Sequence, residues 1–261
     1  MRMFSRWCAV AILLFACDVA EAQSVPRVSV TPFAEAGITL EDYSPEKSPL
    51  LASFIENNPD LTLLRPLAAL VTNSSAKKVV GLTLRWSWRD SEGQTHIRDY
   101  KTDSLFLVNT PVAQPNSRIL VTPGYLWAES YVEFGSMTGG MQNLRRDVGI
   151  FDRSSEVVVH LDTVIFDDGL LIGPDVSRTL ADIRARKAVS DSISLAVVQM
   201  VDGGGDPTNL LREYANTRGE NDLVNRWYVR LSGLILRAPD RRAQAEQLLN
   251  TPQVSHLRRN P

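Results

Sequence analysis

Two polar side chains in a stretch of alternating residues are the best candidates for chemistry, because His160 and Asp162 stand two positions apart. Successive residues of a β-strand point to opposite faces, so residues two apart share a face. A histidine beside a carboxylate can act as a general base or bind a metal. His160 and Asp162 are therefore candidate catalytic residues of a hydrolase. A solvated polar face on a half-exposed strand explains the same pair without any activity, and the sequence favours that interpretation.

A run of acidic residues close to a predicted turn forms a second candidate site. Ca²⁺ accepts carboxylate oxygens as ligands. The spacing matches no EF-hand loop, and aspartates are common in turns because their side chains bond to the nearby backbone. The sequence therefore favours turn chemistry and predicts neither a metal nor a cofactor. The candidate metal ligands are Asp162, Asp167, Asp168 and Asp175.

Familiar catalytic motifs are missing from the chain, which contains no HExxH, no GxSxG and no GxxxxGKS/T pattern. The run Gly203–Gly205 could approach a phosphate through its amides, but it lacks the lysine and the preceding strand of a phosphate-binding loop. It is better explained as the end of a helix. The motifs therefore favour a binding function over an enzymatic one.

A long segment without regular pattern, residues 135–154, is the best candidate for binding a partner. Such a connection is uncommon in a compact domain and is usually functional or mobile. Loops on a rigid scaffold carry function disproportionately, so we predict a recognition loop here, with a disordered excursion as the alternative. Its candidate contacts are Met137, Met141, Leu144, Arg145, Arg146 and Phe151.

The element that must position these residues is a strand over Val79–Asp90, which has strict alternation. One face holds Val80, Leu82, Leu84, Trp86 and Trp88. The strand needs a sheet against this apolar face, so it is the predicted centre of a β-sandwich. The two tryptophans are predicted to lie in the core, rather than to form the stacking platform of a carbohydrate-binding module.

Other strands can be placed by the same pattern. Leu67–Thr72 is apolar throughout and predicts an interior strand, whereas Gln94–Lys101 is mostly polar and predicts an exposed edge strand. Glu156–Phe166 returns to alternation, and Leu170–Ile172 completes a hairpin after a tight turn. Val157, Val159, Leu161, Thr163 and Ile165 are predicted to share one face.

Helical periodicity replaces strand periodicity after Gly173, beginning with a helix that Asp175 or Ser177 caps. The order of strands followed by helices predicts an α+β fold by segregation, namely an antiparallel β-sandwich followed by a C-terminal α-helical region. The predicted divisions are a signal peptide over 1–22, an irregular lead-in over 23–62, a sandwich over 63–174 and a helical region over 175–261.

The first 22 residues have the three parts of an export signal: a basic start, a short apolar run and the cleavage pattern Ala20-Glu21-Ala22. We expect an exported protein, periplasmic or extracellular. Leu14-Phe15-Ala16-Cys17 resembles a bacterial lipobox, so a lipid anchor at Cys17 is the alternative, although simple cleavage is favoured. The formal charge of −2 gives no reason to expect nucleic acid, and no integral membrane segment is expected after cleavage.

Residues 63–172 resemble an immunoglobulin-like β-sandwich, with about seven or eight short strands and a tryptophan in an early central strand, but without the cysteine pair. The Asn73-Ser74-Ser75 loop, this tryptophan strand and the Asp90–Gly93 turn also resemble exported bacterial proteins of unknown function. We expect a non-enzymatic exported or cell-envelope protein that binds or scaffolds a protein or envelope partner. The alternatives are a hydrolase that uses His160 with neighbouring carboxylates, and a carbohydrate-binding module.

Overall fold

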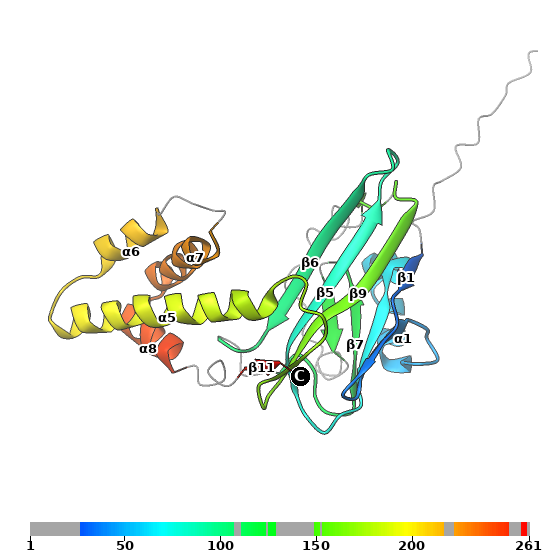
Figure 1. The fold of residues 1–261 in the computed structure, drawn as a ribbon, viewed down its shortest axis with the longest axis horizontal. Helices are drawn as coiled ribbons and strands as arrows, with labels where there is room; N and C mark the ends of the chain where they lie inside the picture. The colour runs from blue at the N-terminus through cyan, green and yellow to red at the C-terminus, as the bar shows by residue number, and fades with distance from the viewer. Residues whose placement is uncertain are drawn as a thin grey trace, which may run out of the picture.

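The computed structural model describes residues 27–106, 111–123, 125–128, 149–151, 153–216, 222–250 and 257–259. They form two β-sheets, called here the β unit, and a group of helices beside them (Figure 1). The predicted signal peptide over 1–22 and its alternative lipid site at Cys17 lie outside the described residues. Helices and sheets are both well represented, so the α+β class is confirmed.

Sheet A has the strand order β11–β10–β9–β5–β6, with β1 also paired to β9. Its strands are β1 (Val28–Val30), β5 (Val79–Arg89), β6 (Thr95–Asp103), β9 (Glu156–Phe166), β10 (Leu170–Ile172) and β11 (Arg258–Arg259). Sheet B has the order β2–β3–β4–β7–β8. Its strands are β2 (Phe33–Glu35), β3 (Ile38–Asp42), β4 (Ala69–Asn73), β7 (Ser117–Thr122) and β8 (Tyr125–Ala128).

One hydrophobic core joins the two sheets. Strand β5 contributes Leu84 and Trp86, and sheet B contributes Leu70 and Ile119, all of them at most 1 % exposed. Trp86 therefore lies in the core, as its alternation with leucines predicts. Three short helical elements between β3 and β4 add apolar side chains to this core: α1 (Pro49–Glu56), α2 (Pro59–Thr62) and η1 (Arg65–Leu67).

Two features of the predicted sandwich are wrong. The segment over 23–62 is not an irregular lead-in throughout, because β1, β2 and β3 place residues 28–42 in both sheets. The sandwich is also not purely antiparallel, since β1 runs parallel to β9 and β11 runs parallel to β10. Both parallel partners come from outside the predicted sandwich range, so pairing between distant segments decides the sheet edges.

Two irregularities in the pairing of β5 with β9 reverse the predicted faces. The register shifts beside Val80 and beside Asp162, so each is an extra residue in its strand. Each extra residue moves the following side chains to the opposite face. Thr163 and Ile165 consequently point away from the sandwich core that Val157 enters, contrary to the predicted shared face.

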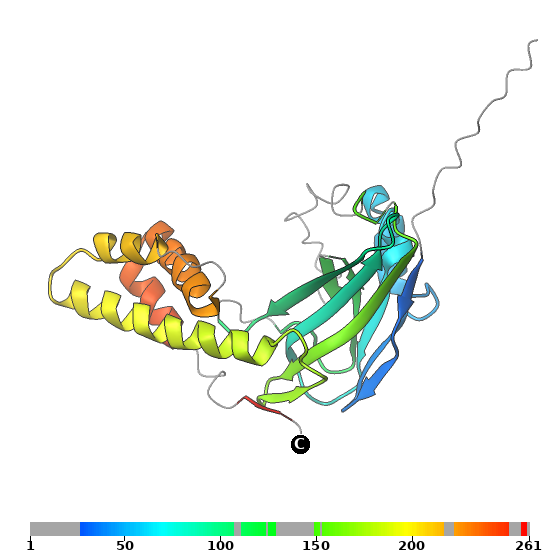
Figure 2. The same ribbon diagram turned by 45° about the horizontal axis from the view of Figure 1, so that its top comes forward.

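Four helices form a separate helical unit with its own apolar core: α5 (Thr179–Asp202), α6 (Thr208–Ala215), α7 (Leu223–Arg237) and α8 (Arg241–Leu249). A small cluster that includes Val80, Ile165, Ile183 and Leu257 joins this unit to sheet A. Figures 1 and 2 both show the N-terminal end of α5 reaching the sheet while the rest of the helix extends away from it. None of the described helices is long and apolar enough to cross a membrane.

Candidate functional site: an arginine-lined cleft

The predicted pair of His160 and Asp162 is not brought together. His160 stands opposite Arg85 in the sheet, and Arg85 is held by Asp99 through hydrogen bonds of 2.7 and 3.0 Å. Partial burial, and then the positive charge of Arg85, lower the pKa of His160. A cation rather than a carboxylate therefore faces the imidazole, so the predicted general-base arrangement is wrong.

Asp162 has a structural role in the connection between β10 and α5. Its side chain is 2 % exposed and accepts hydrogen bonds from the Val176 and Ser177 amides at 2.8 and 3.2 Å. The Ser177 hydroxyl donates a third at 2.5 Å. A buried carboxylate must be satisfied by donors in this way, and these bonds leave it tied to backbone rather than to a histidine.

The four candidate metal ligands do not form one site. Asp175 accepts a hydrogen bond from the Thr179 amide at 2.6 Å at the start of α5, but the N-cap residue is Arg178, so neither Asp175 nor Ser177 occupies the predicted cap position. Asp168 forms an ion pair with Lys77 at 2.7 Å, and this hydrogen bond is the main cause of its lowered pKa. Among the residues that the structure describes, no group of three or more His, Cys, Asp or Glu side chains could hold a metal ion. The calcium hypothesis for Asp162, Asp167, Asp168 and Asp175 is therefore not supported there.

Of the six candidate contacts in the predicted recognition loop, only Phe151 lies among the described residues. Phe151 is 0 % exposed and packs edge-on against Trp88 with ring centroids 5.1 Å apart, so its prediction as a binding residue is wrong. Its side chain fills the sandwich core instead. The remaining candidates, Met137, Met141, Leu144, Arg145 and Arg146, lie outside the described residues.

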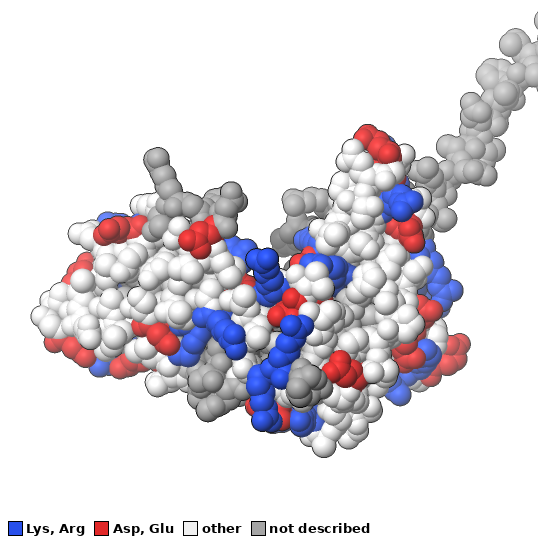
Figure 3. All heavy atoms as spheres, in the orientation of Figure 1, with Lys and Arg blue, Asp and Glu red and all other residues white. Residues whose placement is uncertain are grey.

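A cleft of about 680 Å³ lies between β6, α5 and α7, and sequence reasoning did not single it out. This volume falls within the usual range for ligand sites, roughly 300–1,000 Å³. Figure 3 shows Lys and Arg side chains gathered where the helical unit meets the β unit. Six cationic residues line the cleft: Arg98, Lys101, Arg178, Arg186, Arg226 and Arg230. Among the described residues three carboxylates line it, those of Asp99, Asp103 and Asp182.

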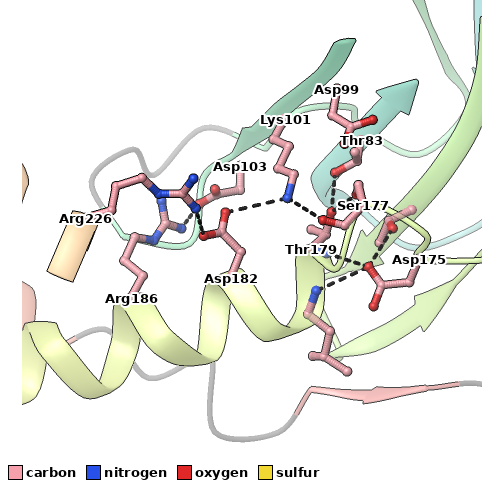
Figure 4. Close-up of polar contacts among 12 residues, drawn as sticks. Thr83, Asp99, Lys101, Asp103, Asp175, Ser177, Thr179, Asp182, Arg186 and Arg226 are labelled. Atoms are coloured by element: carbon pink, nitrogen blue, oxygen red, sulfur yellow. Dashed lines mark hydrogen bonds and ion pairs between the residues drawn. The ribbon is translucent and has the colours of Figure 1, made fainter. Parts of the chain in front are cut away.

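Asp182 on α5 connects all three walls of the cleft (Figure 4). One of its carboxylate oxygens accepts hydrogen bonds from Arg226 and from the Trp227 indole N–H of α7, each at 2.9 Å. The other oxygen lies 3.8 Å from the Lys101 ammonium on β6. Because its side chain is 15 % exposed, these contacts are partly shielded from water and hold α7 and β6 at a defined separation.

Arg186, one turn further along α5, makes a second connection. Its guanidinium donates to Asp103 at 2.6 Å and lies 3.6 Å from the centroid of the Phe106 ring, with the Trp227 ring 5.0 Å away on α7. A guanidinium against aromatic faces is attracted by their π electrons, more strongly where water is excluded. The Nε atoms of Arg186 and Arg226 are buried without a hydrogen-bond partner within the described ranges.

The remaining cations give the cleft a surplus of positive charge. Arg98, Arg178 and Arg230 are exposed, and none has an ion-pair partner in the part of the chain that the structure describes. Asp99 is already neutralised by Arg85 outside the cleft. The local surplus stands out because the whole chain carries a formal charge of −2. The arrangement can attract and hold a negatively charged group.

A local signal for this site does exist in the sequence. Arg226 and Arg230 are four residues apart on α7 with Trp227 between them, and Asp182 and Arg186 have the same spacing on α5. Residues four apart share a helix face, so each pair could be recognised as one polar face. Periodicity could not show that the two faces meet β6.

No protein-family model, no curated protein and no solved structure matches the chain.

Proposed function

We propose that this protein is an exported, non-enzymatic binding module that holds a negatively charged partner in the cleft between β6, α5 and α7. The observation that carries the proposal is the presence of three exposed arginines, Arg98, Arg178 and Arg230, around a cleft of ligand size, none of which has an ion-pair partner among the described residues. Oriented cations around a recess concentrate anions and speed their association. The export signature over 1–22 supports a periplasmic or extracellular setting.

We also propose that the scaffold is an immunoglobulin-like sandwich. Support comes from the two sheets that share one core and from Trp86 on β5, an interior strand of sheet A. Domains of this architecture serve as rigid platforms for recognition. A binding function fits a scaffold whose described residues bring no histidine–carboxylate pair together at His160.

Charge-matched variants test the proposal. We would titrate the protein at moderate ionic strength, about 0.1 M, with inorganic phosphate, citrate and a fluorescein-labelled hexaglutamate peptide, using calorimetry and fluorescence anisotropy. The double variant Arg98→Gln/Arg230→Gln removes two cations that make no described ion pair. It is expected to weaken binding of the tightest of these anions about tenfold, because two charge contacts of roughly 0.7 kcal/mol each sum to about 1.4 kcal/mol.

The matched control is Arg89→Gln/Arg184→Gln, which removes two exposed arginines outside the cleft lining. It lowers the net charge equally but is expected to leave affinity within about twofold at moderate salt, where distant charges are screened. Equal losses in both double variants would mean that the anion responds to overall charge and not to the cleft. Failure of all three anions to bind would also contradict the proposal.

A further inference from the structure

We propose that the partner is an acidic peptide segment in extended conformation, which adds to sheet A as a further strand along β6. This inference rests on the proposed binding of an anionic partner in the cleft. It names the chemical class of that partner and the way in which its backbone is recognised.

Strand β6 is an open edge of sheet A. Within the described ranges it pairs only with β5, and none of its nine residues is buried. The edge prediction for this polar stretch is thus confirmed. A sheet edge presents a row of unpaired N–H and C=O groups that can pair with another chain.

The register shows which backbone groups are available. Beyond one end of the ladder the Ser104 amide donates to the Val80 carbonyl at 2.9 Å, and beyond the other the Asp90 amide donates to the Gln94 carbonyl at 3.0 Å. Hydrogen-bonded positions alternate along an antiparallel ladder. The even-numbered residues of β6 therefore bond to β5. The backbone groups of the odd-numbered residues point outward: Thr95, Ile97, Asp99, Lys101 and Asp103.

The cleft follows this edge. Its lining includes six consecutive residues of β6, from Arg98 to Asp103, rather than alternate residues from one face. Six strand residues span about 17 Å, and an added strand would lie about 4.8 Å from β6. The opposite wall is formed by Leu223, Arg226, Trp227 and Arg230 of α7. A peptide paired with β6 would thus have its other side against this helix.

The charge of the two walls selects an acidic peptide. Arg98 on β6 and Arg230 on α7 have no described ion-pair partner, so carboxylates on the added strand can pair with both. The Trp227 ring in the cleft and Ile97, which is 60 % exposed at the end of the edge, offer apolar contacts between the charged ones. Backbone pairing supplies affinity in such strand addition, while side-chain contacts supply specificity.

The test separates backbone pairing from charge. The probe is a fluorescein-labelled octapeptide that alternates Glu and Val, compared with two N-methylated forms of identical charge. One form carries methyl groups on alternate Glu amides and the other on alternate Val amides. Only one set of amides can face β6, so one form is expected to bind at least about tenfold more weakly, and the other to stay within about threefold of the parent.

The protein side is tested with Ile97→Pro, which removes one outward N–H and no charge, with Ile97→Val as the matched control. Proline is tolerated at edge positions whose N–H faces solvent. Near-ultraviolet circular dichroism checks the fold. The Pro variant is expected to bind the octapeptide at least about fivefold more weakly and the Val variant to bind it unchanged. If the Pro variant misfolds, the methylated peptides still decide the question.

The outcomes distinguish this inference from the proposed function. If both methylated forms bind like the parent, or both lose affinity equally, strand addition is overturned. A loss in Arg98→Gln/Arg230→Gln would then leave the anion-binding function standing. If phosphate or citrate binds but the octapeptide does not, strand addition is likewise overturned and the anion-binding function stands. If none of these probes binds, the inference and the function both fall.

Discussion

The carboxylate of Asp162 holds the connection between β10 and α5 in one conformation. Its spacing from His160 indicates a catalytic pair, yet it is buried and accepts hydrogen bonds from the connection that leads into α5. Thr163 also donates to it at 3.2 Å. A carboxylate satisfied by so many donors stabilises one backbone conformation and is poorly placed to exchange protons with a substrate.

Replacing this carboxylate should therefore lower stability strongly. Asp162→Ala leaves the Val176 and Ser177 amides without their buried acceptor, so we expect a loss of about 3 kcal/mol in the free energy of unfolding. Asp162→Asn keeps the shape and one acceptor and should lose less. Urea unfolding followed by tryptophan fluorescence measures both. Wild-type stability in the Ala variant would contradict the structural role given to Asp162.

At the scale of elements, the β-bulge at Asp162 and the glycine beside it determine how the β unit leads into α5. Gly173 has a φ of +92°, and a Cβ there would lie 2.6 Å from the Asp162 carbonyl oxygen. Only glycine combines this backbone conformation with so close an approach. The bulge also turns Ile165 toward Ile183 of α5, so one extra residue creates the apolar contact between sheet and helix.

A pair of glycine variants separates the effects of conformation and space. Gly93 also has a positive φ, +79°, but an added Cβ would meet nothing within 4 Å. Gly93→Ala should cost about 1–2 kcal/mol for the left-handed conformation alone. Gly173→Ala should cost at least about 2 kcal/mol more, because backbone atoms must also move apart. Thermal unfolding measures the loss of stability in both variants. Equal losses would rule out a steric contact between residue 173 and the bulge at Asp162.

On the scale of the whole molecule, two units with separate cores meet at a small junction. The apolar cluster around Ile165 and Ile183 is supplemented by Asp182 and Arg186, which pair with residues of β6 and α7. The same residues line the cleft, so the junction and the candidate site are one structure. A shift of the helical unit relative to sheet A would therefore change the width of the cleft.

Asp182→Ala should loosen the two units from each other. The variant leaves Lys101 and Arg226 facing each other without their shared carboxylate, so we expect a loss of about 2 kcal/mol and faster proteolysis of residues 173–178. The control is Asp191→Ala, which breaks a partly exposed ion pair with Lys187 within α5 and should cost less than about 0.5 kcal/mol. Urea unfolding and limited proteolysis measure the two effects, and similar results for both variants would argue against a junction held by Asp182.

Periodicity alone was enough to locate most of the regular elements. The strand predicted over Val79–Asp90 is β5, and the one over Glu156–Phe166 has the bounds of β9. The region of helical periodicity after Gly173 contains α7, which Asp222 caps by accepting from the Val224 amide. These features depend on residues within a few positions of each other. In such a stretch, apolar residues at every second position indicate a strand, and apolar residues at every third to fourth position indicate a helix.

The tertiary structure alone decided the faces after each bulge and the location of the cleft. A period of two cannot reveal that Asp162 is an extra residue, since this follows from its pairing with β5 and its bonds to Val176 and Ser177. The cleft depends on contacts such as Arg186 with Asp103, which are 83 positions apart. Two charged residues so far apart in the sequence show no regular spacing that could link them. They act together only because the helical unit packs beside β6, where a low-dielectric junction strengthens each contact.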